Sequence, residues 1–499
     1  MSYWHLTAPP AVGGREGWLP KKCGVAVIGG GLTGILTAYM LRRAGIRAIV
    51  LESHEVGYGQ SASSTGKITV ATGLTYGKLL TERGAAAAHI YAEAQSRALD
   101  EYREVIRREG IRCDYEELPA ALYTRRAPEK LEAEAIAARG AGLRVEMKRR
   151  TALPFDVSLA LVYPGQAQFH PVKFLAALAR RVDVYTGLTV TDVRGNSLLM
   201  DDGQEMEAEK IVYACHYPFR NFPGLYFMKL YQSLSYGIAL GGITPLPGMY
   251  FGIDRGGLSL RSHGNTLLLV GGGHRTGEWG RDPEHTGLSY LRAAAIRYYP
   301  RVRVVSEWAG QDCISPDGLP LIGTYSSLAP DHFVATGFSK WGITGSMVAA
   351  TLLTDLITGR QNAVAPYLHP GRFGADTLRT AIAQGGRAAA GLGKRLLPAA
   401  EVAEELTPGA GGIVRAGGKN VAAYRDNGGA LHTVAPVCSH LGCALTWNPD
   451  TKTWDCPCHG SRFSESGSVV SSPAVKPLAN LPDKSDKSCR LTDRKEQKC

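Results

Sequence analysis

The sequence contains no long apolar run, although 44% of its 499 residues are hydrophobic. A helix that crosses a bilayer needs about 20 consecutive apolar residues, so we expect no transmembrane segment. The first twenty residues also lack the basic start and the apolar block that together form a secretory signal. These two absences predict a cytoplasmic protein.

A basic patch interleaved with aromatic residues is absent as well. The formal net charge is +11, yet lysine and arginine are scattered along the chain, apart from a modest cluster between Lys484 and Lys498. Nucleic-acid binding needs a concentrated basic patch or a fold signature, so no nucleic-acid partner is expected. A scattered basic surface can still attract an anionic substrate or an acidic redox partner.

Cysteine is scarce outside one cluster near the end of the chain. Of the ten cysteines, four are widely separated and have the character of buried small apolar residues, and two stand in a polar tail. The other four lie among histidines, which favours a metal site over a disulfide framework in a chain without a secretory signal. The separated cysteines are Cys23, Cys113, Cys215 and Cys313, the tail cysteines are Cys489 and Cys499, and the clustered ones are Cys438, Cys443, Cys456 and Cys458.

A strand–turn–helix–strand pattern stands near the start of the chain. Residues 24–31 form an apolar run that ends in glycines, which predicts a strand and a tight turn. Residues 32–45 have helical spacing and close on a glycine. Residues 46–52 predict a second buried strand. The chain is too long for one core, so this βαβ unit is expected to begin the first of two or three domains.

Three glycines of this unit occupy the positions of the dinucleotide-binding fingerprint. Gly29 allows the tight turn, Gly31 lets the backbone approach a pyrophosphate, and Gly34 lets the helix pack on the strand. Glu52, at the end of the second strand, can accept a hydrogen bond from a ribose hydroxyl. The pattern therefore predicts a dinucleotide site, without distinguishing FAD from NAD.

A second glycine run occurs in TLLLVGGGHRTG, residues 266–277. The polar stretch EWGRDPEHTG follows it, so no helix can begin where a phosphate needs the helix N-terminus. We interpret this run as a turn. A single nucleotide site argues against a reductase that binds two nucleotides.

The stretch GGGLTGILTAYMLRRAGIRAIVLE resembles the D-amino acid oxidase-like flavoprotein superfamily, which includes glycine and sarcosine oxidases. The resemblance implies an α/β Rossmann-type FAD-binding domain with an interleaved α+β substrate domain, and it selects FAD as the cofactor. Four later segments resemble the same superfamily in the same order, at residues 59–69, 210–218, 308–323 and 335–359.

The resemblance also assigns residues to the flavin. His54 and Cys215 lie near flavin-contacting segments, but neither carries an attachment signal, so we expect non-covalent binding. The expected contacts are Gly29, Gly31, Leu32, Thr33, Gly34 and Glu52 for the adenosine diphosphate, Val190 for the adenine, Ser61, Ser64, Thr65 and Lys67 for the ribityl chain or ring, and Gly342, Ile343 and Thr344 for the ring.

The cysteine cluster has the ligand spacing of a Rieske centre, C-x-H and then C-x-x-H after fifteen residues. Cys438 and Cys456 are the expected thiolate ligands of one iron, and His440 and His459 the imidazole ligands of the other. Two cysteines and two histidines could also bind zinc, but zinc sites more often use CxxC and HxxxH pairs. A purely structural cluster is the alternative for its role.

CSHLGC and CPCHGS resemble the cluster loops of Rieske proteins in respiratory cytochrome bc complexes. The resemblance implies a disulfide between Cys443 and Cys458 and a proline loop at residues 472–478. It also implies a hydrogen bond from Ser461 to a bridging sulfide. Phe463 stands where those proteins have a tyrosine that donates to a ligand sulfur, so we expect a lower reduction potential than theirs.

These patterns divide the chain into domains and leave the substrate site open. We expect the substrate subdomain in residues 80–150 and 225–305, and no catalytic base is evident. Candidate pocket residues are Tyr76, His170, Arg261, His274, Arg275 and Lys340. The expected domains are an N-terminal arm (1–20), an FAD-dependent oxidoreductase domain (21–365), a partly helical linker (366–399), a small all-β Rieske domain (400–492) and a tail (493–499).

A flavin accepts two electrons at once, whereas a Rieske cluster passes one at a time. The resemblance implies a dehydrogenase that oxidises a C–N bond of an amine or amino acid and passes electrons through the cluster to an external acceptor. The chain is similar to FAD-dependent oxidoreductases with a C-terminal Rieske domain, including Ser2 to Trp4. An electron-transfer or redox-sensing module without organic substrate, or an O₂-using oxidase with a structural cluster, remains an alternative.

Overall fold

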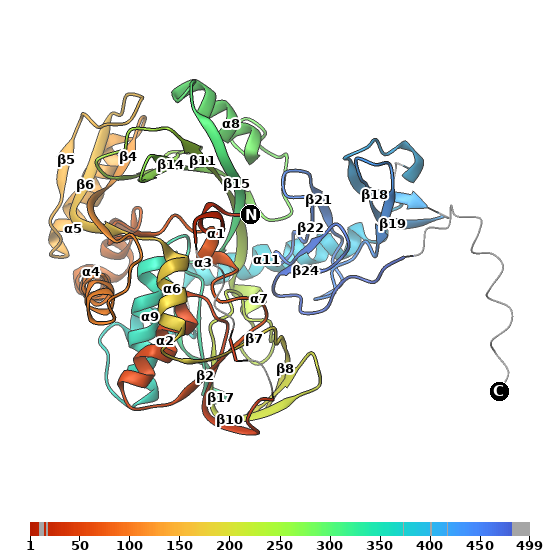
Figure 1. The fold of residues 1–499 in the computed structure, drawn as a ribbon, viewed down its shortest axis with the longest axis horizontal. Helices are drawn as coiled ribbons and strands as arrows, with labels where there is room; N and C mark the ends of the chain where they lie inside the picture. The colour runs from red at the N-terminus through yellow and green to blue at the C-terminus, as the bar shows by residue number, and fades with distance from the viewer. Residues whose placement is uncertain (9–13, 16–17, 373, 400–401, 417, 482–499) are drawn as a thin grey trace. The chain divides into compact units, whose positions relative to one another are not determined.

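The computed structural model describes residues 1–8, 14–15, 18–372, 374–399, 402–416 and 418–481 (Figure 1). The chain forms two compact units, which are described separately. The first unit contains residues 1–274 and 280–380, and the second contains 275–279 and 381–499. Cys489, Cys499, the lysine cluster of the tail and the predicted tail domain lie outside the described residues.

A largely parallel sheet forms the first layer of the first unit. Its central strand β1 lies between β10 and β2, and β17 follows β10, with all four strands parallel. Strand β7 extends the sheet beyond β2, β16 pairs antiparallel with β17, and β8 and β9 form a hairpin beside β10. The strands are β1 (Lys22–Ile28), β2 (Ala48–Glu52), β7 (Asp183–Thr186), β8 (Val190–Arg194), β9 (Ser197–Met200), β10 (Glu205–Tyr213), β16 (Leu321–Ser326) and β17 (Ala329–Thr336).

The apolar strands of this sheet are covered by helices, as a parallel sheet requires. Helix α2 (Leu32–Arg43) packs against α9 (Gly342–Ile357) and α6 (Pro171–Ala179). Val27, Ile35 and Met347 belong to the largest hydrophobic cluster, so strand and helices share one core. The predicted βαβ unit is thus observed as β1, α2 and β2.

A nine-stranded, mainly antiparallel sheet forms the other layer of the first unit. Its order is β15-β11-β14-β13-β12-β4-β6-β3, with β5 beside β6. The second glycine run lies inside β14, and the next helix, α8, begins only at Gly287, so no nucleotide-type turn forms there. The strands are β3 (Lys67–Ile68), β4 (Glu116–Thr124), β5 (Glu146–Lys148), β6 (Leu159–Gln168), β11 (Tyr231–Gly241), β12 (Met249–Gly252), β13 (Ser259–His263), β14 (Thr266–Arg275) and β15 (Arg303–Ile314).

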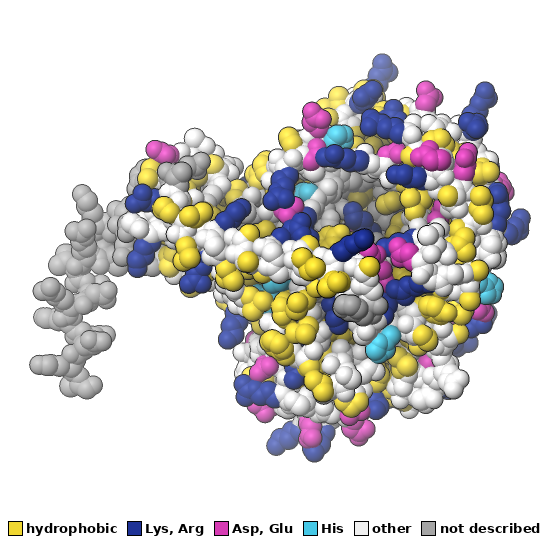
Figure 2. Space-filling model, turned by 180° about the vertical axis from the view of Figure 1, so that it is seen from behind, with side chains coloured by type: hydrophobic (Ala, Val, Ile, Leu, Met, Phe, Trp, Pro, Cys, Tyr) yellow, Lys and Arg dark blue, Asp and Glu magenta, His cyan; other side chains and the backbone are white. Residues whose placement is uncertain are grey.

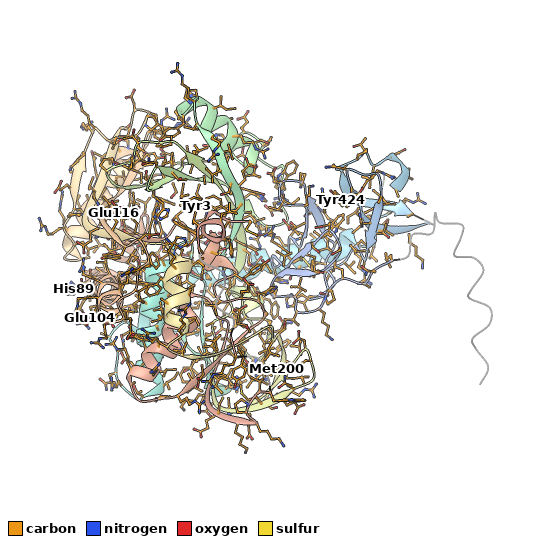
Figure 3. The ribbon with its side chains drawn as sticks, in the orientation of Figure 1. Tyr3, His89, Glu104, Glu116, Met200 and Tyr424 are labelled. Atoms are coloured by element: carbon orange, nitrogen blue, oxygen red, sulfur yellow. A yellow bond between two sulfur atoms is a disulfide. The ribbon has the colours of Figure 1, made fainter. Side chains whose placement is uncertain are left out.

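Further helices complete this unit. A long helix, α4, contains one non-helical residue, Gly84, and packs against α5 and α9. In Figure 3, Met200 marks the parallel sheet, Glu116 the antiparallel sheet and Tyr3 the first helix. The remaining helices are α1 (Tyr3–Thr7), α3 (Gln60–Ser63), α4 (Thr75–Arg108), α5 (Pro128–Gly140), α7 (Tyr226–Lys229), α8 (Gly287–Tyr298) and α10 (Ala365–Leu368).

The second unit is a small β domain with one long helix. Two sheets, β18-β19-β20 and β21-β22-β23-β24, enclose a core that includes Trp454 and Phe463. The elements are α11 (Ala375–Lys394, of which residues 381–394 belong to this unit), η1 (Ala403–Glu405), β18 (Gly411–Ala416), β19 (Lys419–Arg425), β20 (Leu431–Val434), β21 (Thr446–Asn448), β22 (Thr453–Asp455), β23 (Arg462–Ser464) and β24 (Val469–Ser471).

The charge on the surface of the first unit and the apolar content of the helices bear on two expectations from the sequence. Figure 2 shows lysine and arginine side chains spread over the visible face of the first unit, with acidic side chains among them. Throughout the described ranges, no helix is both long enough and apolar enough to span a bilayer.

Candidate cofactor and substrate sites

The ends of the parallel strands bring the predicted flavin residues to one edge of the sheet. Gly29 follows β1 and Glu52 ends β2. Gly337, which belongs to the resembling segment 335–359 that leads to Gly342, follows β17. Because these strands run in the same direction, their carboxyl ends lie at the same edge, where ligands of open α/β sheets bind.

The first glycine turn has room for backbone only. Gly29 has φ +110°, and a Cβ atom there would lie 2.6 Å from the carbonyl oxygen of Ala214. A Cβ atom on Gly34 would lie 1.9 Å from the carbonyl oxygen of Gly29. Helix α2 begins directly after Gly31, and this N-cap residue has no side chain that could cap the helix. The turn therefore fits a pyrophosphate, which helix N-terminal amides and a close backbone can hold.

Glu52 is held beside this turn. The backbone N–H of Gly30 donates to Glu52 Oε2 at 2.6 Å, and the N–H of His54 donates to Oε1 at 2.9 Å. Ser61 Oγ accepts from the N–H of Leu32 at 3.0 Å, which places α3 over the start of α2. Glu52, which was expected at the adenosine diphosphate, and Ser61, which was expected at the ribityl chain or ring, thus both contact the glycine turn or the start of α2.

Buried donors hold the segment 63–66, which the resemblance assigns to the flavin. Trp308 Nε1 donates to the carbonyl oxygen of Ser63 at 3.0 Å. Trp4 Nε1 donates to the carbonyl oxygen of Ser64 at 2.7 Å. Arg261 Nη1 donates to the carbonyl oxygens of Thr65 and Gly66 at 2.9 and 2.8 Å. Four consecutive carbonyl oxygens are therefore fixed by three side chains from distant parts of the chain, which orients the rest of the segment.

Arg261 was predicted to line the substrate pocket, but its side chain lies inside the fold instead. Its side chain is 0% exposed, lies 5.1 Å from the Trp4 ring, and also donates to the Phe169 carbonyl oxygen. Burial lowers the pKa of Arg261 to about 9. Its donors stabilise backbone carbonyls of the flavin segment, so it does not provide the open fork that a substrate carboxylate needs.

Lys67 also points away from the position that the resemblance gives it. Its Nζ atom donates to the carbonyl oxygen of Tyr250 and to Ser259 Oγ, each at 2.7 Å. Burial lowers the pKa of Lys67 well below its usual value. The amine therefore ties β3 to β12 and β13 within the antiparallel sheet.

The start of α9 is anchored to its surroundings. Thr344 Oγ1 accepts from the N–H of Thr69 and donates to its carbonyl oxygen, both at 2.9 Å, and Tyr102 OH donates to the carbonyl oxygen of Ile343 at 2.8 Å. Ser339 and Lys340, just before the helix, have φ values of +50° and +76°. Two consecutive non-glycine residues in the left-handed region are unusual and mark a constrained turn.

Two other predicted pocket residues have their polar atoms engaged by the fold. Tyr76 OH donates to the carbonyl oxygen of Val70 at 2.7 Å inside the main core. His170 caps α6 by accepting from the N–H of Lys173, and its Nε2 lies 3.1 Å from Thr7 Oγ1. As with Arg261, these contacts correct the prediction, because the side chains support packing instead of lining a substrate site.

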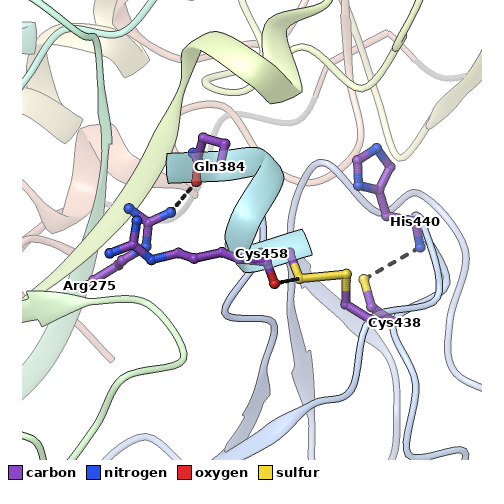
Figure 4. The surroundings of a disulfide bond; sticks show 7 residues. Arg275, Gln384, Cys438, His440 and Cys458 are labelled. Carbon is purple, nitrogen blue, oxygen red and sulfur yellow. Dashed lines mark hydrogen bonds between the residues drawn. A yellow bond between two sulfur atoms is a disulfide. The ribbon is translucent and has the colours of Figure 1, made fainter. Parts of the chain in front are cut away.

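The predicted neighbours His274 and Arg275 fall in different units. His274 Nε2 lies 2.9 Å from Tyr236 OH in the first unit. Arg275 belongs to the second unit, where its guanidinium donates to Gln384 Oε1 (Figure 4) and lies 4.0 Å from Glu278. Arg275 is thus engaged by residues of the second unit.

The remaining flavin candidates are distributed as follows. Val190 is buried in a hydrophobic cluster with Ile28 and Leu51, the last apolar residues of β1 and β2. His54 stacks on Tyr58 with ring centroids 4.7 Å apart. Burial raises the pKa of Cys215 to about 12.

Sequence reasoning missed one charged residue near these segments, Asp312 on β15. Its Oδ1 accepts from Gln60 Nε2 of α3 at 3.5 Å, and it lies opposite Ser233 of β11. Burial raises the pKa of Asp312, and Lys340 opposes that rise. The only signal in the sequence was an acid within a strand of the resembling segment 308–323.

In the second unit, the two loops that carry the cluster ligands have matching backbones. The N–H of Cys438 donates to the carbonyl oxygen of Cys443, five residues later, and the N–H of Cys456 donates to that of Ser461 at the same interval. Gly442 and Gly460 each donate back to the first cysteine of their loop at 2.9 Å and have positive φ. Two equivalent turns therefore present the predicted ligands.

The four predicted cluster ligands lie together. The rings of His440 and His459 have centroids 5.2 Å apart. Burial lowers the pKa of His440 to about 4 and that of His459 to about 3, so both imidazoles are neutral, as metal ligation requires. A hydrogen bond from Cys456 lowers the pKa of Cys438. Two adjacent sulfurs and two neutral imidazoles are the donor set that suits a Rieske cluster.

A disulfide joins the two loops, between Cys443 and Cys458 (Figure 4). The sulfur atom of the ligand candidate Cys456 lies within 4.8 Å of both. Helix α11 packs closely on this disulfide, because a Cβ atom on Gly391 would lie 2.7 Å from Cys458 Sγ. The disulfide that the resemblance implied is therefore present, and the helix covers it.

The expected outer residues of the cluster are also in place. Ser461 is fully buried, its hydroxyl accepts from the N–H of Ala474 at 3.1 Å, and it hydrogen-bonds to Cys438. Ser439 Oγ donates to the carbonyl oxygen of Lys476 at 2.6 Å, which ties the proline loop to the first ligand loop. Phe463 is fully buried in the core of this unit.

Comparison with protein-family models gives two matches. The model of the FAD dependent oxidoreductase family matches residues 24–356, and the model of the Rieske [2Fe-2S] domain matches residues 398–482. Both matches coincide with the geometry described above, so the chain has binding sites for FAD and for a Rieske 2Fe-2S cluster.

Two of the curated relatives match the chain over different lengths. A Bacillus subtilis protein named as a Rieske 2Fe-2S iron-sulfur protein, YhfW, is 34% identical over 483 residues, which cover 92% of this chain and 93% of that protein. The cytochrome b6-f complex iron-sulfur subunit 3 of a Nostoc species is 32% identical over 138 residues, covering 27% of this chain and 71% of the subunit.

Solved structures that resemble the chain include a dehydrogenase, an oxidase and a deaminase. L-proline dehydrogenase from P. horikoshii has a TM-score of 0.59 at 16% identity and covers 71% of this chain and 98% of its own. Glycine oxidase from Geobacillus kaustophilus has a TM-score of 0.59 at 21% identity and covers 71% and 100%. L-amino acid deaminase from Proteus vulgaris has a TM-score of 0.59 at 17% identity and covers 73% and 100%. At these identities the likeness shows the fold.

Proposed function

Because the chain belongs to the FAD-dependent oxidoreductase family and carries a Rieske 2Fe-2S domain, we propose that it is a dehydrogenase of amines or amino acids that delivers electrons through its cluster to an external acceptor. The observation that carries this proposal is the presence, in one chain, of the glycine turn at Gly29–Gly34 and the paired ligand loops at residues 438–461. An FAD-dependent oxidoreductase takes two electrons from its substrate. A one-electron carrier in the same chain is therefore expected to provide the path by which these electrons leave the flavin.

When bound, FAD supplies a two-electron acceptor for the substrate and the cluster supplies a one-electron carrier. The chain's own residues hold and orient these groups. We assign the adenosine diphosphate to Gly29, Gly31, Leu32, Thr33, Gly34 and Glu52, the adenine to Val190, the ribityl chain or ring to Ser61, Ser64 and Thr65, the ring to Gly342, Ile343 and Thr344, and the cluster to Cys438, His440, Cys456 and His459.

The reaction that we assign is oxidation of a C–N bond to an imine, which water then hydrolyses. It draws support from the solved structures of the same fold, which are a proline dehydrogenase, a glycine oxidase and an amino acid deaminase. We assign the flavin chemistry to residues 21–365, with the substrate subdomain in 80–150 and 225–305, and the cluster to residues 400–492. The arm (1–20), the linker (366–399) and the tail (493–499) complete the proposed organisation.

The experiment is an anaerobic titration of purified protein with a panel of amines and amino acids. Flavin bleaching is followed by visible absorbance and cluster reduction by electron paramagnetic resonance. A substrate that bleaches the flavin and then produces a Rieske-type signal supports the proposal. Bleaching without a cluster signal contradicts the electron path, and reduction by dithionite alone contradicts the substrate class.

The Cys438→Ser variant separates the two parts of the proposal. It removes one cluster ligand and leaves the glycine turn intact, so substrate should still bleach the flavin while turnover with an artificial acceptor is lost. The matched control is Cys23→Ser, because Cys23 lies on β1, outside the cluster loops. Unchanged turnover in Cys438→Ser would show that electrons leave the flavin by another path.

A further inference from the structure

Two charged side chains stand where the flavin segments meet the antiparallel sheet. Asp312 lies on β15 and receives its hydrogen bond from Gln60 of α3. Lys340 lies in the constrained turn before α9, and its Nζ donates to Ser235 Oγ of β11 at 3.3 Å. Both α3 and the start of α9 carry residues assigned to the flavin, so these charges lie beside the proposed reaction site.

The strand register places the two charges on one face of the sheet. Ser233 lies opposite Asp312 and Ser235 opposite Gly310 in the antiparallel pair of β11 and β15. Residues that are opposite, or two apart on one strand, point to the same face. A Cβ atom on Gly310 would lie 3.1 Å from Ser63 Cβ, so α3 approaches this face directly.

The two charges act on each other, because Lys340 opposes the rise that burial causes in the pKa of Asp312. In the described part of the chain, Asp312 accepts one long hydrogen bond, of 3.5 Å, and forms no ion pair within 4.0 Å. The same holds for Lys340, whose contact with Ser235 Oγ is also long. A carboxylate that is withdrawn from water without strong partners costs stability, and such groups are typical of functional sites.

The two arginines that were candidates for binding a substrate carboxylate are engaged by other groups. Arg261 is buried and donates to backbone carbonyl oxygens, and Arg275 is engaged within the second unit. Gly273 of β14 keeps the space beside Lys340 open, because a Cβ atom there would lie 3.4 Å from Lys340 Nζ and 3.2 Å from Ser235 Oγ. Among the cationic pocket candidates predicted from the sequence, Lys340 is therefore the one whose amine lies on this face.

We propose that Asp312 and Lys340 together recognise a zwitterionic amino acid, with Asp312 binding the ammonium group and Lys340 binding the carboxylate. This inference rests on the proposed function, which supplies the flavin as oxidant, and it names the substrate class. The ammonium gives one proton to Asp312 and becomes a neutral amine. The Cα–H bond then breaks with its electron pair passing to the flavin, the C–N bond becomes an iminium, and water releases the keto acid and ammonium.

The test compares matched substrates on matched variants. Each active amino acid is assayed beside its decarboxylated amine, with wild type, Asp312→Asn and Lys340→Met. Asp312→Asn should lower kcat/KM about 100-fold or more for both substrates, in the range of a lost general base. Lys340→Met should raise KM for the amino acid about tenfold or more while changing the amine little, because only the amino acid offers it a carboxylate.

Controls come from an ion pair on the same unit. Lys210 and Asp331 lie 3.4 Å apart on the partly exposed strands β10 and β17, so Lys210→Met and Asp331→Asn make the same charge changes away from the site. FAD content and the visible spectrum report whether each variant is intact. If Asp312→Asn loses FAD, Asp312→Ser takes its place, and binding of a non-oxidisable amino acid, followed as a shift of the flavin spectrum, should also weaken.

The outcomes distinguish this inference from the proposed function. If no amine or amino acid reduces wild-type protein, the proposed function fails and this inference falls with it. If wild type is reduced and Asp312→Asn has wild-type kcat/KM with FAD bound, only the inference is overturned. Equal preference for amino acid and amine in wild type, or an unchanged preference in Lys340→Met, overturns the assignment of Lys340.

Discussion

The two cofactor sites of this chain are built in opposite ways. The cluster site comes from two short loops within the 22 residues from Cys438 to His459, and the loops repeat the same backbone hydrogen bonds. The flavin site gathers segments that extend from Trp4 to Thr344. A local site depends on a few bonds inside one small domain, whereas a dispersed site depends on the packing of the whole first unit.

This comparison predicts that each site can be destroyed without the other. The strongest case is Gly34→Val, because a Cβ atom at this position would lie 1.9 Å from the carbonyl oxygen of Gly29. We expect complete loss of FAD with retention of the cluster, measured as flavin absorbance against iron content and the dithionite-reduced paramagnetic signal. Gly24→Ala is the control, since its nearest atom would be 3.9 Å away. Retained FAD in Gly34→Val would refute the assigned turn.

The reverse case is Cys456→Ser. It removes a ligand candidate while leaving the Cys443–Cys458 disulfide in place, so the cluster should be lost and FAD should remain near one per chain. Iron and flavin analysis of the same sample measures both. A variant that keeps its iron would argue for a different ligand set and would revive the zinc alternative if zinc were found instead.

A smaller effect is expected from the distant support of the flavin segment. Trp4→Phe keeps the aromatic packing but removes the indole donor to the Ser64 carbonyl oxygen, 60 residues away. Loss of one buried hydrogen bond of about 1–1.5 kcal/mol corresponds to roughly tenfold weaker FAD binding. Reconstitution of deflavinated protein with FAD measures this change, and Trp18→Phe, which is exposed, is the control. Equal affinity would show that α1 does not support the flavin site.

The smallest expected change sharpens the description of the cluster. Phe463→Tyr restores the hydroxyl that respiratory-type Rieske proteins place near a ligand sulfur, so the midpoint potential should rise while the cluster content stays constant. A redox titration followed by paramagnetic resonance measures the shift. In the opposite direction, Ser461→Ala should lower the potential, since Ser461 hydrogen-bonds to Cys438. An unchanged potential in both variants would mean that these side chains do not tune the cluster.

The same contrast explains what the sequence could predict. The cluster spacing and the glycine motif are local patterns, and they predicted a Rieske cluster and a dinucleotide site. The resemblance to a flavoprotein superfamily then selected FAD and the fold class, and the comparisons confirm these predictions. Side-chain direction is not local. Arg261 was expected near substrate but is buried against carbonyl oxygens nearly 200 residues away in sequence, because the antiparallel sheet turns it inward.

Asp312 was missed for a related reason. Its neighbours Gln60 and Lys340 come from other elements, and the pairing of β11 with β15 is what places it on the face that α3 approaches. Likewise, no pattern indicated that residues 275–279 pack with the second unit. Contacts between distant segments follow from the packed fold and have no signature in spacing or composition.

The most direct test of the account is rapid-freeze paramagnetic resonance after anaerobic mixing with an active amino acid, performed in parallel on wild type and Cys438→Ser. The account predicts flavin bleaching in both proteins and a Rieske-type signal that appears after bleaching in wild type only. Flavin bleaching in wild type without any cluster signal over many turnovers would contradict the claim that the cluster carries the substrate's electrons.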